Sequence, residues 1–414
     1  MRRVVITGIG VISPLGNDIT SLMEGLAQGR SAVKRMDGWA DFKGLHSLVG
    51  APAVLENEKK IPRQQRRSMG RLSVFAAQAA QQALDDAGFT PEMITSERTG
   101  CVVGSTMGSA ASITEAFELV FPARDLSQLP STKFFQCVSH TAAMNISQCF
   151  GINGNVLAPS AACASGLQAV GVGFDLIRSG RQDRVLCGGA EELHPTVTAS
   201  FDVLYATSSH HNDAPKTTPR PFDRDRDGLV CGEGAGILVL EDQETAMARG
   251  AKIYAEVLGF STCGSGAHIS HSNADAMVRC IRQALEEGAL QPQDIDYISA
   301  HATATTHGDV EEAKALREIF GANVPVSSLK GHMGHTLGAS GAIELIASLK
   351  MMEQGVIYPT LNLENIDPEC SGIQHIQTPL KRDVNVVLKN SFAFGGINAA
   401  LVCGKMKSNG GKHK

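Results

Sequence analysis

The sequence predicts an α/β fold made of two similar halves. Short buried strands alternate with amphipathic helices, and the same order of elements begins again after residue 250. The chain has 414 residues and is 43% apolar, so it can bury a large core and exceeds the usual size of one domain. We expect the halves at residues 1–250 and 251–405, followed by a disordered, basic tail at 406–414.

The first half is expected to open with a buried strand at residues 4–9. Apolar residues at helical spacing predict a helix over 69–87, which Gly88 ends. Further elements are expected as strands at 102–103, 185–186 and 234–241 and as a helix at 167–177. Gly8 and Gly10 match part of a dinucleotide-binding fingerprint, but Ser13 stands where the third glycine belongs, so a nucleotide site is a weak alternative.

The second half follows the same order. We expect strands at 253–260 and 297–298 and helices at 276–287, 311–319 and 341–352. No residue-level repeat is visible, so the similarity of the halves rests on the order of the elements alone.

Composition excludes several classes of protein. The net charge of −5 gives no reason to expect a nucleic acid or an anionic membrane as partner. The ten cysteines include no C-x-x-C pair, so neither a zinc site nor a disulfide scaffold is indicated. No run reaches the roughly 18 apolar residues that a membrane span needs, and we expect a cytoplasmic protein.

A cysteine lies among small residues just before a predicted helix, in the stretch PSAACASG at 159–166. Unpaired N–H groups and the helix dipole at that position favour a thiolate, and small neighbours let a carbonyl approach the backbone. Cys163 is therefore a candidate nucleophile. Taken alone, the motif more often marks a buried structural cysteine.

Two histidines follow predicted strands in the second half. His301 comes after the strand at 297–298, and Thr303 and Thr305 lie on the same side of the extended segment behind it. A hydrogen-bonded core histidine is the alternative. The stretch SSLKGHMGHTLGASG at 327–341 offers Lys330 and His335 in a Gly-rich turn, where a phosphate loop is the rival, although its G-x-x-x-x-G-K-[ST] order is absent.

Taken together, these motifs resemble the elongating β-ketoacyl-ACP synthases, condensing enzymes of the thiolase superfamily. The resemblance extends over nearly the whole chain, and the matching stretches are SPLG at 13–16, ACASG at 162–166, PFDRDRDG at 221–228, HATAT at 301–305, KGHMGH at 330–335 and FAFGGIN at 392–398. It implies a thiolase-like, five-layered α-β-α-β-α fold in which the cysteine of the first half meets both histidines of the second.

The resemblance also implies the reaction. Cys163 accepts an acyl group, and His301 and His335 form the paired imidazoles that activate a malonyl unit, with Lys330 as the active-site lysine. Malonyl-ACP loses CO₂, and the resulting enolate attacks the acyl group on Cys163. No metal or redox cofactor is implied.

Further positions receive roles from the resemblance alone. Thr303 and Thr305 would bind the phosphopantetheine arm, and Asp309 and Glu312 would support the network around Lys330. The backbone N–H groups of Cys163 and Phe394 would form an oxyanion hole. The acyl pocket and its gate would be lined by Met107, Phe134, Phe392 and Phe394, and Phe134 and Phe135 would act across a dimer. The partner implied is acyl carrier protein, which is acidic.

A cluster of four arginines precedes the helix at 69–87 and is a candidate docking surface for that carrier, although a solvated helix face explains such a cluster equally well. The four residues are Arg63, Arg66, Arg67 and Arg71. A homodimer is expected, or a heterodimer with a homologous chain-length partner.

Three positions depart from the family pattern, because Ala302, Ala393 and Ile397 stand where the relatives carry glycine, glycine and threonine. Alanine disfavours positive φ, so either those glycines provide space or the loops here are shaped differently. The departures favour a specialised polyketide or polyene pathway slightly over fatty-acid elongation. A non-catalytic chain-length partner and an acyl-thioester hydrolase are the rival functions.

Overall fold

The computed structural model describes residues 1–266 and 273–406, so most of the tail expected to be disordered lies outside the described residues. Its eleven-stranded sheet has the order β12-β10-β9-β14-β15-β8-β1-β7-β6-β4-β5. The first half supplies β1 (Val4–Ile12), β4 (Thr99–Gly104), β5 (Val156–Leu157), β6 (Arg184–Glu191) and β7 (Gly234–Asp242). The second half supplies β8 (Ala255–Gly264), β9 (Tyr297–Ser299), β10 (Pro325–Ser327), β12 (Gln374–His375), β14 (Val386–Ala393) and β15 (Ile397–Gly404).

The pairing of these strands shows that the two halves are built alike. From the centre outwards, the first half has two antiparallel pairs, β1–β7 and β7–β6, followed by two parallel pairs, β6–β4 and β4–β5. In the second half β8, β15, β14, β9 and β10 pair in the same sequence of directions. Strands β1 and β8 join the halves through three residue pairs.

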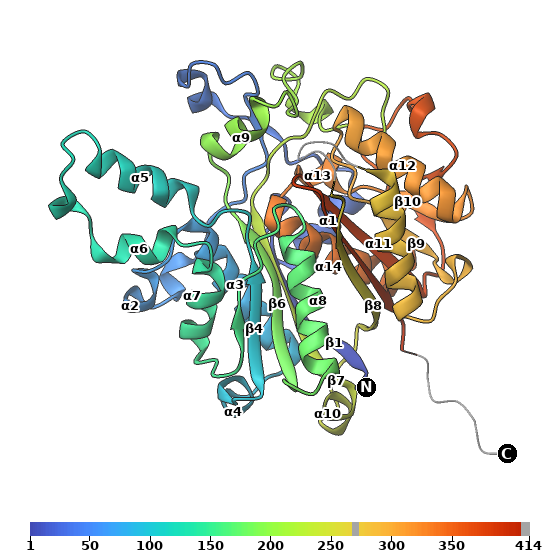
Figure 1. Ribbon diagram of the computed structural model, residues 1–414, viewed down its shortest axis with the longest axis horizontal. Coiled ribbons are helices and arrows are strands. Elements are labelled where there is room, and N and C mark those ends of the chain that lie inside the picture. Colours follow the sequence, from blue (N-terminus) through green and yellow to red (C-terminus); the bar gives the residue numbers. More distant parts are fainter. Residues whose placement is uncertain (267–272, 407–414) are drawn as a thin grey trace.

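The helices form three layers around the two halves of this sheet, and Figure 1 shows α8 and α14 side by side in the middle of the molecule. These two central helices are α8 (Ser165–Arg178) and α14 (Ser340–Gln354). The outer layers hold α3 (Arg71–Ala87) and α7 (Thr141–Phe150) on the first half and α11 (Ala274–Glu287) and α12 (Thr306–Phe320) on the second. Helix α14 contacts β7 of the first half and β14 of the second. The five-layered thiolase-like fold is thereby confirmed.

The remaining elements are short and lie in the connections. The helices among them are α1 (Ile19–Ala27), α2 (Arg63–Arg66), α4 (Pro91–Thr95), α5 (Ala110–Val120), α6 (Ser131–Cys137), α9 (Pro195–Asp202), α10 (Gln243–Ala248) and α13 (Lys330–Met333). The strands are β2 (Lys34–Arg35), β3 (Val49–Gly50), β11 (Val356–Ile357) and β13 (Leu380–Lys381). No helix in the described part of the chain is both long enough and apolar enough to cross a membrane.

Gly8 and Gly10 allow helix α3 to pack closely against strand β1. A Cβ on Gly8 would meet the carbonyl oxygen of Ala83 at 2.3 Å, and one on Gly10 would meet that of Ala79 at 2.0 Å. Helix α3 therefore lies directly on the strand at these points. This close contact accounts for both glycines, and the weak nucleotide alternative loses its support.

Glycines also bring the central layer together beside the candidate nucleophile. A Cβ on Gly166 or Gly189 would meet the carbonyl oxygen of Gly338 at 2.5 or 2.1 Å. Gly166 lies in the first turn of α8, Gly189 in β6, and Gly338 in the turn before α14. This approach sets the start of α8 against the second half of the chain.

Candidate active site

Cys163 lies in a tight turn before α8 and its side chain is buried. The preceding Ala162 has a φ of +47°, which a side chain adopts only when its surroundings enforce it. Ser165 provides that enforcement, because its Oγ accepts the Ala161 N–H at 2.8 Å and donates to the Ala162 carbonyl at 2.7 Å. The turn fixes the position of the Sγ atom.

His301 follows β9 and is held through its backbone by α12. The Glu312 carboxylate accepts the N–H of His301 at 2.9 Å and that of Ala302 at 2.6 Å. Two residues on, the Asp309 carboxylate accepts the N–H of Ala304 at 3.1 Å. Both acidic side chains are buried, so they clamp the segment between strand and helix.

His335 follows α13 and is fixed by a different part of the chain. Its N–H donates to the Val230 carbonyl at 2.7 Å, and its own carbonyl accepts the N–H of Gly232 at 2.8 Å. The imidazole rings of His301 and His335 lie 5.1 Å apart, centroid to centroid, at an angle of 82°. The Cys163 Sγ and one nitrogen from each ring all lie within 4.8 Å of one another.

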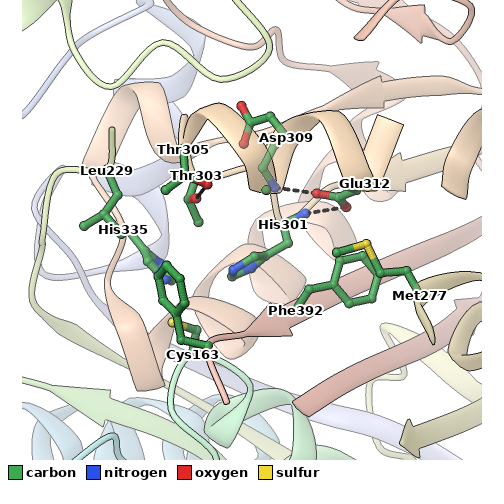
Figure 2. A pocket seen from close by; sticks show the side chains of 13 residues that line it. Cys163, Leu229, Met277, His301, Thr303, Thr305, Asp309, Glu312, His335 and Phe392 are labelled. Carbon is green, nitrogen blue, oxygen red and sulfur yellow. Dashed lines mark hydrogen bonds between the residues drawn. The ribbon is translucent and has the colours of Figure 1, made fainter. Parts of the chain in front are cut away.

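These three side chains line one pocket, which Figure 2 shows with both imidazoles turned towards Cys163. Thr303 and Thr305 line it as well, and their Oγ1 atoms lie 3.1 Å apart, on the same side as the sequence predicts. Phe392 and Phe394 complete the predicted residues of the wall. The structure thus brings together a nucleophile, two imidazoles, two hydroxyls and an aromatic rim.

Burial controls the protonation of the site. It raises the pKa of Cys163 to about 12, although the Lys330 ammonium acts in the opposite direction. The expectation of a thiolate at rest is therefore wrong, because loss of solvent outweighs the helix terminus. Burial, reinforced by the charge of Lys330, holds the pKa of His301 and of His335 well below the usual value. At neutral pH the site contains a thiol and two neutral imidazoles.

Lys330 is fully buried and its ammonium Nζ lies 2.7 Å from Oε1 of Glu344, a residue of α14 that sequence reasoning missed. The expected support from Asp309 and Glu312 takes another form. Glu312 bonds the backbone around His301, while Asp309 bonds that of Ala304 and of Phe222. An acidic residue in the otherwise apolar stretch 342–347 is the sequence signal that could have indicated Glu344.

Glu191 is a second buried carboxyl that the sequence reasoning missed. It lies at the end of β6, and its Oε2 accepts the N–H of Thr106 at 2.8 Å and that of Gly338 at 3.1 Å. Burial raises its pKa to about 7. The group ties the turn before α14 to the first half, close behind Cys163.

Some predicted residues lie elsewhere. Met107 and Phe134 are 40% and 64% exposed and do not line the pocket of the single chain, so their predicted roles at an acyl pocket stay predictions. Phe135, expected to act across a dimer, is 42% exposed. Arg71 pairs with the buried Glu233, to which its guanidinium donates at 2.7 Å, while the docking role of the four arginines stays a prediction.

The departures from the family pattern add volume without straining the backbone. Neither Ala302 nor Ala393 is among the described residues with a positive φ, whereas Gly395 and Gly396 have φ values of +87° and +72°. Ala302 lines the pocket, so its methyl group narrows the room there. Ala393 is buried as well but does not line the pocket.

The fold and the paired imidazoles facing a buried cysteine define a thiolase-like acyltransferase. Within that class the chain belongs to the beta-ketoacyl synthase family, whose N-terminal domain model matches residues 1–246 and whose C-terminal domain model matches 254–364. It is a ketosynthase, and ketosynthases elongate acyl chains by condensation.

Individual relatives agree over the full length. The chain is 36% identical to 3-oxoacyl-(acyl-carrier-protein) synthase 1 of Escherichia coli K12 over 98% of this chain and 100% of the relative. A crystal structure of a beta-ketoacyl synthase from Burkholderia phymatum STM815 has a TM-score of 0.95 and 43% identity, covering 98% of this chain and 100% of that one. A ketosynthase solved with a type II PKS acyl-carrier protein and bound to a hexaketide has a TM-score of 0.90 and 31% identity, with 98% and 100% covered.

Proposed function

We propose that this ketosynthase carries an acyl group on Cys163 and condenses it with malonyl-ACP, using His301 and His335 to activate the malonyl unit. The observation that supports this most directly is the convergence of Sγ and two imidazole nitrogens within 4.8 Å in a buried pocket. The thioester carriers would enter past Thr303 and Thr305, whose hydroxyls hold the phosphopantetheine arm.

In the first half-reaction, the Cys163 sulfur attacks the carbonyl carbon of the acyl thioester. Because the resting thiol is protonated, a neighbouring neutral imidazole takes its proton and returns it to the departing pantetheine thiol. The oxyanion is stabilised by the backbone N–H groups of Cys163 and Phe394, at about 3 kcal/mol for each donor.

In the second half-reaction, malonyl-ACP loses CO₂ and its electron pair moves into an enolate. A neutral imidazole has one N–H to donate, so His301 and His335 together offer two donors to the enolate oxygen. The enolate carbon then attacks the acyl carbonyl, the bond to Sγ breaks, and the Cys163 thiolate takes up one proton from solvent. The product is a β-ketoacyl-ACP two carbons longer.

We place the docking surface for the carrier on α2 and the residue after it. Arg63 and Arg67 are exposed, and Arg66 pairs loosely with Glu58 at 3.7 Å. Arg63 and Arg67 form no ion pair with another described residue, and such exposed guanidinium groups suit an acidic carrier. A related ketosynthase was solved with its acyl-carrier protein. Arg71 is excluded because it is committed to Glu233.

We also propose a homodimer. The edge strand β5 exposes Val156 and Leu157, and α6 exposes Phe134 and Phe135, which a second copy would cover. Both elements contact helix α7, which Figure 1 shows beside α6. Heterodimer formation with a chain-length partner and the expected cytoplasmic location stay predictions.

The acyl group decides the pathway, and we favour a specialised polyketide or polyene substrate because the methyl group of Ala302 narrows the pocket. The test incubates the protein with malonyl-ACP and a panel of acyl-ACPs, and follows acylation of Cys163 and the product by intact mass. Extension of ordinary saturated chains would overturn this preference in favour of fatty-acid elongation. Release of free acid without elongation would indicate a hydrolase.

A further inference from the structure

A second lysine is buried beside Lys330. Lys389 lies in β14, has no exposed surface, and donates from Nζ to the Glu344 carboxylate, to the Ala300 carbonyl at 3.3 Å and to the Ser299 carbonyl at 3.4 Å. An ammonium has three N–H donors, so these three acceptors satisfy it completely. Burying an ammonium group carries a large desolvation penalty even when it is fully hydrogen-bonded, so the presence of a lysine at this position needs an explanation.

Its partners belong to the candidate site. Ser299 and Ala300 are the two residues before His301, at the end of β9. Glu344 bonds Lys389 through Oε2, while its Oε1 lies 2.7 Å from Nζ of Lys330 and accepts from the Ser340 hydroxyl at 2.7 Å. Lys389 thereby links the strand end that carries His301 to the carboxylate that holds Lys330.

Lys389 and the Glu344 carboxylate carry opposite charges. Burial lowers the pKa of Lys389 to about 8 against the opposing charge of Glu344, so it is an ammonium at neutral pH. Burial acts to raise the pKa of Glu344, but the two lysines bring it to about 2, which leaves that group ionised. The titratable groups that face this cluster are Lys330 on α13, Glu312 on α12, Tyr297 on β9, His301 and His335.

Burial lowers the pKa of His301 and His335 most, and the positive charges of Lys330 and Lys389 lower it further. Removing the charge of Lys389 would therefore favour the imidazolium form of both rings. The ammonium of Lys389 thus acts against protonation of His301 and His335.

We propose that Lys389 is a positioning residue of the condensation, whose ammonium fixes the backbone before His301 and the carboxylate that holds Lys330, and whose charge keeps both imidazoles neutral. This inference rests on the proposed function. It assigns to Lys389 no contact with the substrate and no proton transfer.

The test compares Lys389→Met, which removes the charge and the donors, with Lys389→Gln, which removes the charge but keeps an amide donor for the Ser299 and Ala300 carbonyls. Lys405→Met is the control, because Lys405 pairs at the surface with Asp383 at 2.6 Å. Two pH profiles are measured: the condensation rate, and the alkylation of Cys163 by iodoacetamide, which needs no carrier protein. Circular dichroism and thermal unfolding report on the fold.

We expect the acidic limb of both profiles to move to higher pH by about one unit in Lys389→Met and Lys389→Gln, and to stay in place in Lys405→Met. If the acidic limb of both profiles stays in place and kcat falls equally at every pH, the proposal is overturned and Lys389 has only a structural role. Failure of both variants to fold would overturn it too, since Lys389 would then serve the fold. If the proposed function fails, the wild type makes no condensation product, and the alkylation profile still tests the charge effect.

Discussion

The clamp on His301 provides the sharpest prediction about this site. Glu312→Gln keeps the size of the side chain but replaces one acceptor oxygen with an NH₂ group, so one of the two backbone N–H groups of His301 and Ala302 loses its partner. A buried donor left without an acceptor costs about 2 kcal/mol. With an unfolding entropy of about 0.9 kcal/mol/K for 414 residues, the melting temperature should fall by about 2 °C.

Activity should suffer more than stability. Displacing a reacting group by about 1 Å costs on the order of 100-fold in rate, and the clamp is what fixes the His301 backbone. We therefore expect the condensation of acylated enzyme with malonyl-ACP to slow by about 10- to 100-fold, measured by single-turnover mass spectrometry. Acylation of Cys163, whose turn Glu312 does not touch, should slow less.

The matched control is Glu318→Gln, because Glu318 lies on the same helix but pairs at the surface with Arg282 at 2.9 Å. It should leave both half-reactions and the melting temperature unchanged. The reasoning is refuted if Glu312→Gln condenses at the wild-type rate, or if both half-reactions slow equally while the fold is intact.

Three further predictions follow from the same structure. Arg63→Glu and Arg67→Glu should raise KM for the carrier substrates with little change in stability. Arg71→Gln should instead lower the melting temperature and leave KM unchanged, because Arg71 pairs with Glu233. Steady-state kinetics and thermal unfolding distinguish the two effects, and a change of KM in Arg71→Gln would contradict the assignment. Because burial raises the folded-state pKa of Glu191 to about 7, its contribution to stability is present below about pH 4.5 and is lost as pH rises through 7. Glu191→Gln should therefore gain stability relative to the wild type between pH 5 and 8, by up to about 3 kcal/mol in urea unfolding, and a pH-independent difference would contradict this. Ala302→Gly should widen the site and admit bulkier acyl groups in competition assays, and an unchanged substrate preference would show that this methyl group does not shape the pocket.

Much of the fold followed from the sequence because hydrophobic periodicity marks buried strands and amphipathic helices directly. The helix expected at 69–87 runs over Arg71–Ala87, and the strand expected at 253–260 runs over Ala255–Gly264. Helix α12 begins at Thr306, five residues before the expected 311. Its first turn is polar and holds the Asp309 carboxylate that bonds the preceding segment, so it lacks the apolar pattern of a helix start.

The site could be predicted in part. Cys163, His301 and His335 lie in recognisable motifs, and the structure brings them together. The cluster of Lys330, Glu344 and Lys389 could not be predicted, because its members come from three separate segments of the chain. A single charged residue in an apolar stretch does not indicate which residue it pairs with.

The protonation of Cys163 was missed for a related reason. A helix terminus is visible in a sequence, whereas complete burial of one sulfur atom depends on the packing of both halves. Burial outweighs the helix terminus here and gives a thiol at rest.

The central claim is that Cys163 carries the acyl group that a decarboxylated malonyl unit extends. The most direct measurement mixes acylated enzyme with malonyl-ACP labelled isotopically at its free carboxyl, and follows released CO₂, the mass of the Cys163 peptide and the mass of the ACP product in one time course. Labelled CO₂, deacylated Cys163 and a β-ketoacyl-ACP two carbons longer should arise together, and Cys163→Ala should give no extended product. Extended product from Cys163→Ala, or deacylation of Cys163 without elongation, would contradict it.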